Sequence, residues 1–341
     1  MKTYQPLVSI IIPLYNRRRY IEECIDSIFA QTCQDFEVFV VDDGSTDGGA
    51  ELCEEKYGGD ARFHLVRQKN EGAWAARNHG IDLAHGRYVT FLDNDDFLGA
   101  QNGLQYMADL ADQTQADVTA SMGCYDLLDG DNHLHPRFDD PAHKEHPYVL
   151  SDTMEGRMAW YDQYASAAIW NKFFRRDFLE RYHIRFPKTR YHEDCLFVIP
   201  CLFRAKTYVC TPFLYYVYRI SHGSILRAPK TLDDMEEIVQ TMPRILRSVD
   251  DFLGDMPYFK QHPASLRLVK ERQLDELLKM PRQWGFYPTP TEHVDAMKDA
   301  VQEAFASIEL STKEMTLLLA YLFTRYNEDC AILEKESGSR E

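Results

Sequence analysis

Hydrophobic residues follow two different spacings over about the first 120 residues of the chain. Short β-branched runs such as residues 8–12 have the composition of buried strands, and between them apolar residues recur every three or four positions, as on one face of a helix. Near-continuous apolar strands joined by helices are typical of a mostly parallel sheet with helices on both faces. The pattern predicts strands at residues 8–12, 37–41, 63–67 and 88–92, and helices at residues 20–30 and 75–84.

The apolar pattern loosens between residues 123 and about 158, where Asp, His, Gly and Pro are frequent. This composition favours a long insertion or mobile loop. The histidines of the segment have no compact ligand spacing, so we prefer a solvated loop to a metal site. Regular structure is expected to resume with a strand at residues 169–174, a helix that begins near Glu193, and an aromatic strand at residues 214–218.

Beyond Pro229 the amphipathic spacing of helices replaces the strand pattern. Helices are expected near residues 231–253, 264–280, 291–307 and 313–326. We therefore place a domain boundary near Ala228, which separates residues 1–228 from a helical region at residues 229–341. The predicted fold class is α/β, with a Rossmann-like, mostly parallel central sheet flanked by helices and an α-helical C-terminal extension.

Acidic residues outnumber basic ones by 54 to 38, which gives a formal charge of −16. The summed field opposes non-specific binding to nucleic acid or to an anionic lipid surface, so we expect no nucleic-acid partner. The one dense basic cluster, the three arginines at residues 17–19, is large enough to meet a phosphate. A solvated helix start explains this cluster equally well.

Targeting and redox signals in the sequence are few. The eight cysteines form no CxxC pair, so buried thiols in a reducing compartment are expected rather than disulfides or a zinc site. The amino terminus lacks the long apolar core of a secretory signal, and the longest apolar runs are about half the roughly 20 residues of a spanning helix. We expect a cytoplasmic protein with at most peripheral contact with the inner face of the cell membrane.

Two carboxylates, Asp42 and Asp43, follow the second predicted strand. Nucleotides commonly bind at this kind of strand-to-helix turn, where a carboxylate can accept a hydrogen bond from a base N–H. Ser45 or Thr46 is expected to cap the following helix. The alternative interpretation is a solubilising turn, because Asp, Gly, Ser and Thr are the residues that turns prefer.

A second acidic cluster, Asp93, Asp95 and Asp96, follows the fourth predicted strand. The two-residue period of a strand would place Asp93 and Asp95 on the same side of the chain. Mg²⁺ and Mn²⁺ take such oxygen ligands together with water and phosphate oxygens. The alternative is an acidic surface turn, but three carboxylates this close repel one another unless a cation joins them.

Two more segments carry polar residues with functional interpretations. Arg77 and Asn78 lie on a predicted helix, where Arg77 either meets a base or phosphate oxygen or simply faces solvent. Glu193 and Asp194 open an apolar helix. Carboxylates in a first turn are ordinary capping chemistry, and the functional alternative is a general base for a hydroxyl nucleophile.

Five motifs in this order and spacing resemble the family 2 inverting glycosyltransferases with a GT-A fold, of the bacterial cell-surface polysaccharide type. The resemblance covers about residues 7–226. It implies a catalytic domain with a nucleotide-binding half at about residues 1–120 and an acceptor half at about residues 121–228. The motifs are VSIIIPLYN at 8–16, VDDGSTD at 41–47, NEGAWAARN at 70–78, FLDNDD at 91–96 and ED at 193–194.

The resemblance implies transfer of a sugar from a nucleotide diphosphate donor, usually a UDP-sugar, to an acceptor hydroxyl, with inversion in a single displacement. It implies a divalent cofactor, Mn²⁺ or Mg²⁺, held by Asp95, with Asp93 at the ribose or at a metal-bound water. Asp194 matches the catalytic base, Glu193 its neighbour, and Asp42 the carboxylate that reads the base. The residues implied in nucleotide and donor binding are Pro13, Tyr15, Asn16, Asp42, Asp43, Arg77, Asp93 and Asn94.

One segment departs from the family pattern. Residues 216–225 resemble the family's loop that closes over the diphosphate. A second basic residue is often found in that loop after the arginine that matches Arg219, and here Ile220, Ser221 and His222 stand in its place. His222 is therefore a further candidate contact to the diphosphate or the metal. The segment at residues 170–174 resembles the element that borders the acceptor site, although a structural strand explains it as well.

The expected partners are a nucleotide-sugar donor and a glycan or lipid-linked acceptor. The helical region would pack on the catalytic domain by default, and a homodimer or contact with a membrane protein are the alternatives. Two other functions compete with sugar transfer. A non-catalytic nucleotide-sugar-binding protein would not need Asp95 and Asp194, and a nucleotidyltransferase should have a Gly-rich phosphate loop after Ile12, which the sequence lacks.

Overall fold

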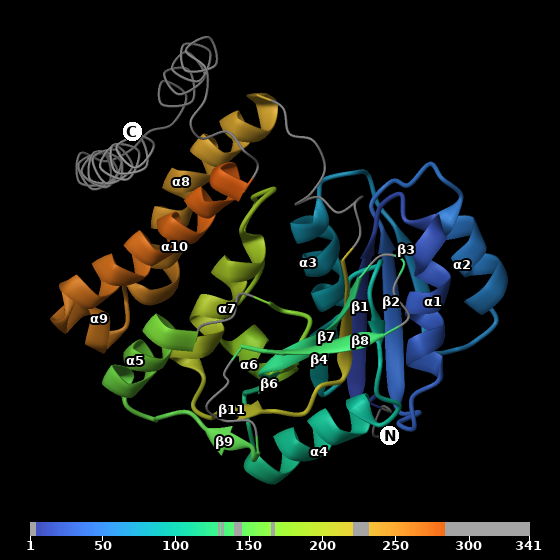
Figure 1. Ribbon diagram of the computed structural model, residues 1–341, viewed down its shortest axis with the longest axis horizontal. Coiled ribbons are helices and arrows are strands. Elements are labelled where there is room, and N and C mark those ends of the chain that lie inside the picture. The colour runs from blue at the N-terminus through green and yellow to red at the C-terminus, as the bar shows by residue number, and fades with distance from the viewer. Residues whose placement is uncertain are drawn as a thin grey trace, which may run out of the picture. The chain divides into compact units, whose positions relative to one another are not determined.

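The computed structural model of the chain describes residues 5–128, 130, 133–139, 145–164, 168–220 and 232–283. The chain divides into two compact units, Met1–Ala228 and Pro229–Glu341. Figure 1 shows the first unit as a central sheet between helices, and the second unit, where it is described, as helices alone.

Four parallel strands form one half of an eight-stranded sheet, whose order is β3-β2-β1-β4-β10-β6-β11-β9. β1 (Val8–Leu14) lies between β2 (Phe36–Asp42) and β4 (Tyr88–Phe91), and β2 also pairs with β3 (Phe63–Arg67). Every residue of β1, β2 and β4 is buried, as the continuous apolar runs predict. All four predicted strands are confirmed, and the carboxyl ends of β1, β2 and β4 meet at one edge of the sheet.

The other half of the sheet is mixed. β10 (Lys172–Arg175) runs antiparallel to both β4 and β6 (Val118–Ser121), whereas β11 (Tyr208–Thr211) is parallel to β6. The short strand β9 (Tyr148–Val149) pairs antiparallel with β11 at the end of this half. The parallel arrangement expected from the sequence therefore holds from β3 to β4 and changes at β10.

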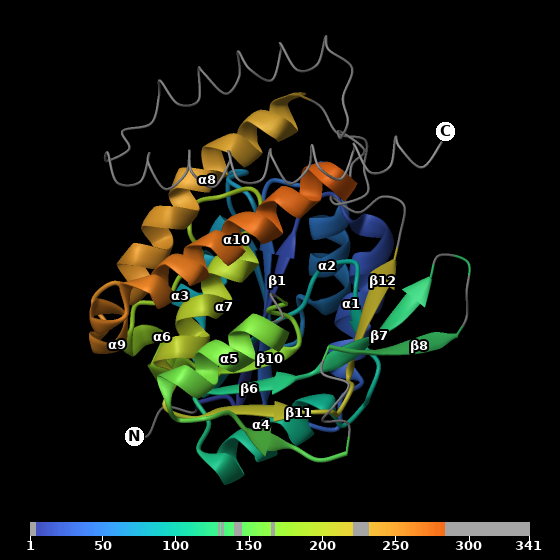
Figure 2. The same ribbon diagram turned by 60° about the vertical axis from the view of Figure 1, so that its left-hand side comes forward.

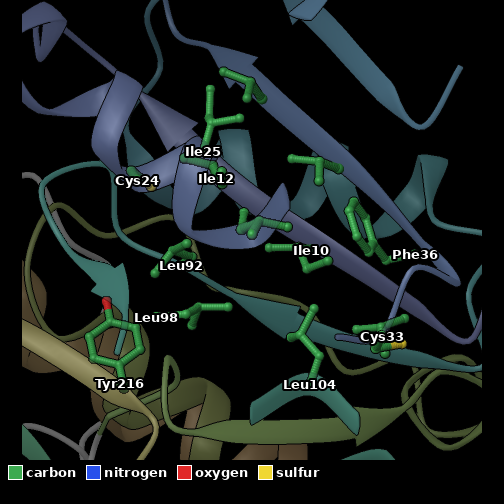
Figure 3. Close-up of a cluster of buried hydrophobic side chains, with 14 of the residues drawn as sticks. Ile10, Ile12, Cys24, Ile25, Cys33, Phe36, Leu92, Leu98, Leu104 and Tyr216 are labelled. Atoms are coloured by element: carbon green, nitrogen blue, oxygen red, sulfur yellow. The ribbon is translucent and has the colours of Figure 1, made fainter. Parts of the chain in front are cut away.

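Helices cover both faces of the parallel half. α1 (Arg18–Phe29) buries one apolar stripe in the core cluster that contains Ile10 and Ile12, as Figure 3 shows. On the other face, Ala76 of α3 (Ala73–Leu83) packs with Phe39 and Val41. The helices predicted at residues 20–30 and 75–84 are thus confirmed, with ends shifted by no more than about two residues.

The segment from residue 123 to about 158, expected to be a long insertion or mobile loop, contains regular structure. β7 (Gly123–Leu128) and β8 (Leu134–Phe138) form a hairpin beside β12 (Tyr216–Ile220), as Figure 2 shows, and β5 (Phe97–Leu98) completes this second sheet. α5 (Met154–Tyr164) follows the hairpin. The expectation was wrong because almost every residue of β8 is exposed, so no alternation of apolar and polar positions marks the strand.

α2 (Gly49–Tyr57) does not begin with the expected hydroxyl cap from Ser45 or Thr46. Its N-cap residue is Gly48, at a left-handed φ of 79°, and the N–H of Gly49 donates to the carboxylate of Asp47 at 3.0 Å. A carboxylate two residues before the helix therefore satisfies the first free N–H in place of a hydroxyl. The other helices in the described part of the first unit are α4 (Gly103–Thr114), α6 (Arg176–Arg181) and α7 (Glu193–Arg204).

The second unit contains α8 (Leu232–Leu253), α9 (Pro257–Gln261) and α10 (Pro263–Gln283). α8 and α10 lie side by side in both views and bury apolar side chains such as Leu246 and Leu274. The helices predicted at residues 231–253 and 264–280 are confirmed, and those at 291–307 and 313–326 lie outside the described residues. In the described part of the chain, no helix combines the length and the apolar composition needed to cross a membrane.

The packing of α3 on β1 can be tested at Gly80. A Cβ at this position would lie 2.4 Å from Cγ2 of Ile11, well inside van der Waals contact. We expect Gly80→Val to lower the free energy of unfolding by about 1–3 kcal/mol through overpacking, measured by denaturant unfolding. Gly59→Val is the control, because a Cβ there meets nothing within 4 Å, and should stay within about 0.5 kcal/mol of wild type. Equal losses at both positions would contradict the close approach.

Candidate functional site

The loops that follow β1, β2 and β4 are hydrogen-bonded together at one edge of the sheet. After β1, the N–H of Asn16 donates to the Ser45 hydroxyl (3.1 Å), and its side-chain oxygen accepts from the N–H of Thr46 (2.8 Å). Asn16 has a φ of 50°, a left-handed conformation that asparagine tolerates better than most residues. After β4, the side chain of Asn94 donates to the carbonyl of Pro13. Three predicted site residues, Pro13, Asn16 and Asn94, therefore lie together.

Asp42 and Asp43 are both buried but have different partners. Asp42 accepts a hydrogen bond from the N–H of Ser45 at 2.9 Å, within its own turn. The carboxylate of Asp43 accepts three hydrogen bonds, at 2.8–2.9 Å, from the loop at residues 68–72 that precedes α3. The structure thus shows Asp43 shaping this loop. The nucleotide contacts expected of Asp42, Asp43 and the half-exposed Tyr15 stay predictions.

The second acidic cluster forms a turn rather than an extension of β4. The N–H of Asp96 donates to the carbonyl of Asp93 at 3.1 Å, and the strand ends before both residues. The strand period was therefore the wrong basis for placing Asp93 and Asp95 together. The two carboxylates face different cations: Asp93 accepts from Arg77 at 2.9 Å, and Asp95 lies 3.6 Å from Arg17.

Asp96 points into the protein and joins the acidic turn to β12. Its carboxylate accepts from the hydroxyl of Tyr216 and from the N–H of Arg219, both at 2.7 Å. Nε of Arg219 also donates to the carbonyl of Asp95 at 2.9 Å. Tyr216 in turn stacks on Trp170, with ring centroids 4.3 Å apart. Asp96, to which the sequence assigned no separate role, therefore holds the turn that carries Asp93 and Asp95.

The surroundings of the acidic turn disfavour the charged form of its carboxyl groups. Burial raises the pKa of Asp95, the charge of Asp93 adds to the rise, and Arg17 opposes it. Burial and both neighbouring carboxylates raise the pKa of Asp96 well above its usual value. Hard oxygen donors of this kind suit Mg²⁺ or Mn²⁺ with water and phosphate oxygens as further ligands. Among the residues that the structure describes, no group of three or more His, Cys, Asp or Glu could hold a metal ion, and His222 lies outside them.

Arg77, on α3, reaches two of the acidic motifs at once. Nη1 donates to Oε1 of Glu193 and to Oδ1 of Asp194, both at 3.0 Å, while Nη2 donates to Asp93. Only 6% of the Arg77 side chain is exposed. One guanidinium therefore brings the start of α7 to the acidic turn after β4. The nucleotide contact implied for Arg77 stays a prediction.

The environment of Asp194 suits a proton acceptor. Loss of water raises the pKa of Asp194 to about 8; Glu193 and Asp93 add to the rise, and Arg77 and Lys172 oppose it. Burial also raises the pKa of Glu193, against the charge of Arg77. The Asp194 side chain is still 29% exposed, so a ligand can reach it. A partly accessible carboxyl group with a raised pKa can act as a general base near neutral pH.

α3 also holds the segment that leads into α7. The side-chain amide of Asn78 donates to the carbonyl of Phe186 and accepts from its N–H, both at 2.8 Å. The guanidinium carbon of Arg77 lies 5.4 Å from the Phe186 ring centroid. His192, directly before α7, has a left-handed φ of 71°, which a residue with a Cβ keeps only when its surroundings hold it. The sequence left Asn78 as an available polar group, because its backbone partner is more than 100 positions away.

The segment at residues 170–174 contributes a strand with buried polar side chains. Nζ of Lys172 donates to the Asn171 side-chain oxygen (2.8 Å) and to the carbonyl of Ala168, and burial lowers the pKa of Lys172 to about 8. Asn171 donates to the carbonyl of Ser121 at 2.7 Å. Sequence reasoning assigned Lys172 no role of its own, although a lysine within an aromatic run was the available signal. The border of an acceptor site stays a prediction for this segment.

The sequence is similar to one known protein family and to several known proteins. The family model described as "Glycosyl transferase family 2" matches residues 9–182. "Uncharacterized glycosyltransferase EpsJ" of Bacillus subtilis (strain 168) is 32% identical over 228 residues, which are 66% of this chain and 64% of that relative. "Putative teichuronic acid biosynthesis glycosyltransferase TuaG" of the same strain is 44% identical over 97 residues, 28% of this chain and 38% of TuaG. The chain spans less than two thirds of the length of either relative.

Among solved structures, S. aureus TarS 1-349 in complex with UDP-GlcNAc is similar to this chain, with a TM-score of 0.64 at 22% identity. The match covers 89% of this chain and 82% of that one. At this level of identity the likeness concerns the fold. It confirms the expected GT-A architecture with C-terminal helices.

The structural role of Asp43 can be tested by unfolding. Asp43→Ala would leave the N–H groups of Glu71 and Gly72 without their acceptor, and we expect a loss of about 2–4 kcal/mol in the free energy of unfolding. Glu71→Ala is the matched control, because it changes an exposed side chain in the same loop and keeps the backbone N–H. It should cost less than about 0.5 kcal/mol. An Asp43→Ala variant as stable as the control would contradict this role.

Proposed function

The chain belongs to glycosyl transferase family 2, and we propose that it transfers a sugar from a UDP-sugar to an acceptor hydroxyl with inversion at the anomeric carbon. The observation that carries the proposal is that the guanidinium of Arg77 donates hydrogen bonds both to Asp194 and to Asp93 of the acidic turn. A donor diphosphate bound at the turn would have a proton acceptor within the same site. A single displacement needs this proximity of donor and base.

In this reaction the acceptor oxygen forms a bond to the anomeric carbon while the bond from that carbon to the diphosphate oxygen breaks. The bonding electron pair leaves with UDP, and the proton of the acceptor hydroxyl passes to Asp194. The raised pKa of Asp194 makes it a stronger proton acceptor than an ordinary carboxylate. Glu193, on the same guanidinium, orients Asp194 or the acceptor. Attack opposite the departing diphosphate gives inversion.

The donor nucleotide is assigned to the edge formed by the carboxyl ends of β1, β2 and β4. Asp42 would accept a hydrogen bond from a base N–H, as uracil and guanine both offer. The choice of UDP is supported by TarS, which was solved in complex with UDP-GlcNAc and shares the fold. The further nucleotide and donor contacts that we propose are Pro13, Tyr15, Asn16, Asp43, Asp93 and Asn94.

A divalent cation, Mg²⁺ or Mn²⁺, is assigned to Asp95, with Asp93 at the ribose or at a metal-bound water. The fit rests on the donor chemistry and on the raised pKa of Asp95, which reflects burial and the nearby charge of Asp93. When bound, the ion would neutralise negative charge on the departing diphosphate. Arg17, 3.6 Å from Asp95, is a protein cation facing the same carboxylate.

The proposed acceptor is a glycan or a lipid-linked glycan, in the synthesis of a cell-surface polysaccharide or glycolipid. The name of TuaG, which refers to teichuronic acid biosynthesis, supports a polysaccharide. A cytoplasmic location with at most peripheral membrane contact belongs to the same proposal, because nucleotide-sugar donors and lipid-linked acceptors would meet there. A homodimer stays a prediction.

A nucleotide screen tests the donor and metal sites. UDP, GDP, CDP and dTDP are added with and without Mn²⁺, and melting temperature and calorimetric affinity are measured. UDP with Mn²⁺ should stabilise the fold by about 3 kcal/mol at a hundredfold excess over Kd, because it binds only the folded state. Asp95→Ala should lose the Mn²⁺-dependent part, whereas Asp109→Ala, an exposed carboxylate on α4, should keep it. Absence of stabilisation by every nucleotide would contradict the proposal.

The base assignment predicts a specific pH dependence. UDP release from saturating UDP-sugar should rise with pH through the raised pKa of Asp194, since the ionised carboxylate accepts the proton. An ordinary aspartate would already be ionised above about pH 5. Asp194→Asn should lower turnover by about 10²–10⁴-fold with UDP affinity largely kept, and Asp177→Asn, an exposed carboxylate on α6, should match wild type. Unchanged turnover in Asp194→Asn would exclude this base.

A further inference from the structure

The guanidinium of Arg77 is committed to three carboxylates, Asp93, Glu193 and Asp194, at 2.9–3.0 Å. Burial opposes its charge, but the three carboxylates outweigh burial and raise its pKa. Its Nε is buried and meets no hydrogen-bond acceptor among the described residues. The three carboxylates therefore determine the orientation of the guanidinium, even though its Nε–H group is left without an acceptor.

The same turn of α3 holds the chain that leads to the base. Arg77 lies against the ring of Phe186, and the next residue, Asn78, makes two hydrogen bonds to the Phe186 backbone. Between Phe186 and Asp194 the chain passes through the left-handed conformation of His192. Two consecutive residues of α3 thus contact both the side chain and the backbone of Phe186, at the start of the segment at residues 186–194, which we call the base segment.

We propose that Arg77 is a positioning residue for the base, which acts through Asp194 and joins it to the acidic turn. This inference rests on the function proposed for the site. The three carboxylates accept hydrogen bonds from both terminal nitrogens of Arg77, so the guanidinium sets the position of Asp194 relative to Asp93. Only 6% of the Arg77 side chain is exposed, so packing as well as hydrogen bonding holds the guanidinium in place.

The charges around Asp194 give the inference a distinct signature. Arg77 and Lys172 favour the ionised carboxylate, whereas Glu193 and Asp93 oppose it, and Arg77 is the larger of the two favourable charges. Removal of the positive charge should therefore raise the pKa of Asp194 further. A lysine at position 77 would keep the charge but lacks the planar fork that bonds two carboxylates at once.

The experiment compares Arg77→Gln, Arg77→Lys and wild type in the full chain. Three quantities are measured: UDP affinity by calorimetry, kcat for UDP release at saturating UDP-sugar, and the pH profile of kcat. Arg77→Gln should lower kcat by about 10²-fold and move the profile to higher pH, with UDP affinity within about threefold of wild type. Arg77→Lys should lower kcat but keep the wild-type pH profile, which separates position from charge.

Arg185→Gln is the matched control. Arg185 also links the base segment to α3, through Asp82 at 2.9–3.0 Å, but it contacts none of the three carboxylates of the site. Its kcat and pH profile should equal those of wild type. In an Asp194→Asn background, Arg77→Gln should lower kcat little further, because a residue that acts through Asp194 loses its effect once Asp194 cannot accept a proton.

The inference is overturned if Arg77→Gln weakens UDP binding about tenfold or more and leaves kcat and its pH profile unchanged. If Arg77→Gln does not fold, Arg77→Lys provides the test. A wild-type kcat in Arg77→Lys overturns the inference, and a lower kcat with unchanged UDP affinity supports it. Asp194→Asn separates the two proposals. Full turnover in that variant removes the base and the proposed mechanism, whereas an inactive Asp194→Asn beside fully active Arg77 variants removes the positioning role alone.

Discussion

Buried carboxylates must face cations or hydrogen-bond donors, and this constraint organises the proposed site, since an unmatched buried charge costs several kcal/mol. Asp43 is matched by N–H groups of the loop before α3, Asp96 by β12, and Asp194 by Arg77. Each pairing joins segments that are distant in sequence. The loops at the carboxyl ends of the strands are consequently held by the same acidic residues that line the site.

How fully each carboxylate is matched separates structural residues from those proposed to react. Both oxygens of Asp43 accept hydrogen bonds from the loop at residues 68–72, and both oxygens of Asp96 accept hydrogen bonds from Tyr216 and Arg219. Asp95 and Asp194 remain partly exposed, at 22% and 29% of their side chains. These are the residues to which we assign the cation and the acceptor proton. Each is therefore accessible to a ligand, a cation at Asp95 and an acceptor hydroxyl at Asp194.

Local patterns predicted some parts of this structure better than others. The continuous apolar runs identified β1, β2 and β4, because complete burial leaves a signal that needs no knowledge of neighbours. β8 escaped prediction, since its exposed residues leave no such signal. The cap of α2 was assigned to a hydroxyl, whereas the carboxylate of Asp47 binds the N–H of Gly49 and the N–H of Arg18 as well. That second partner belongs to α1 and is brought there by tertiary packing.

The sequence by itself determined the buried strands and the positions where acidic motifs follow them, because both depend on residues close together in the chain. It also indicated the family through the order of its five motifs. Only the tertiary structure decided which carboxylate meets which cation. Arg77 and Asp194 are 117 positions apart and lie within 3.0 Å, a distance set by the packing of α3 and α7. Hydrogen bonds and ion pairs depend on such distances, and no periodicity along the chain encodes them.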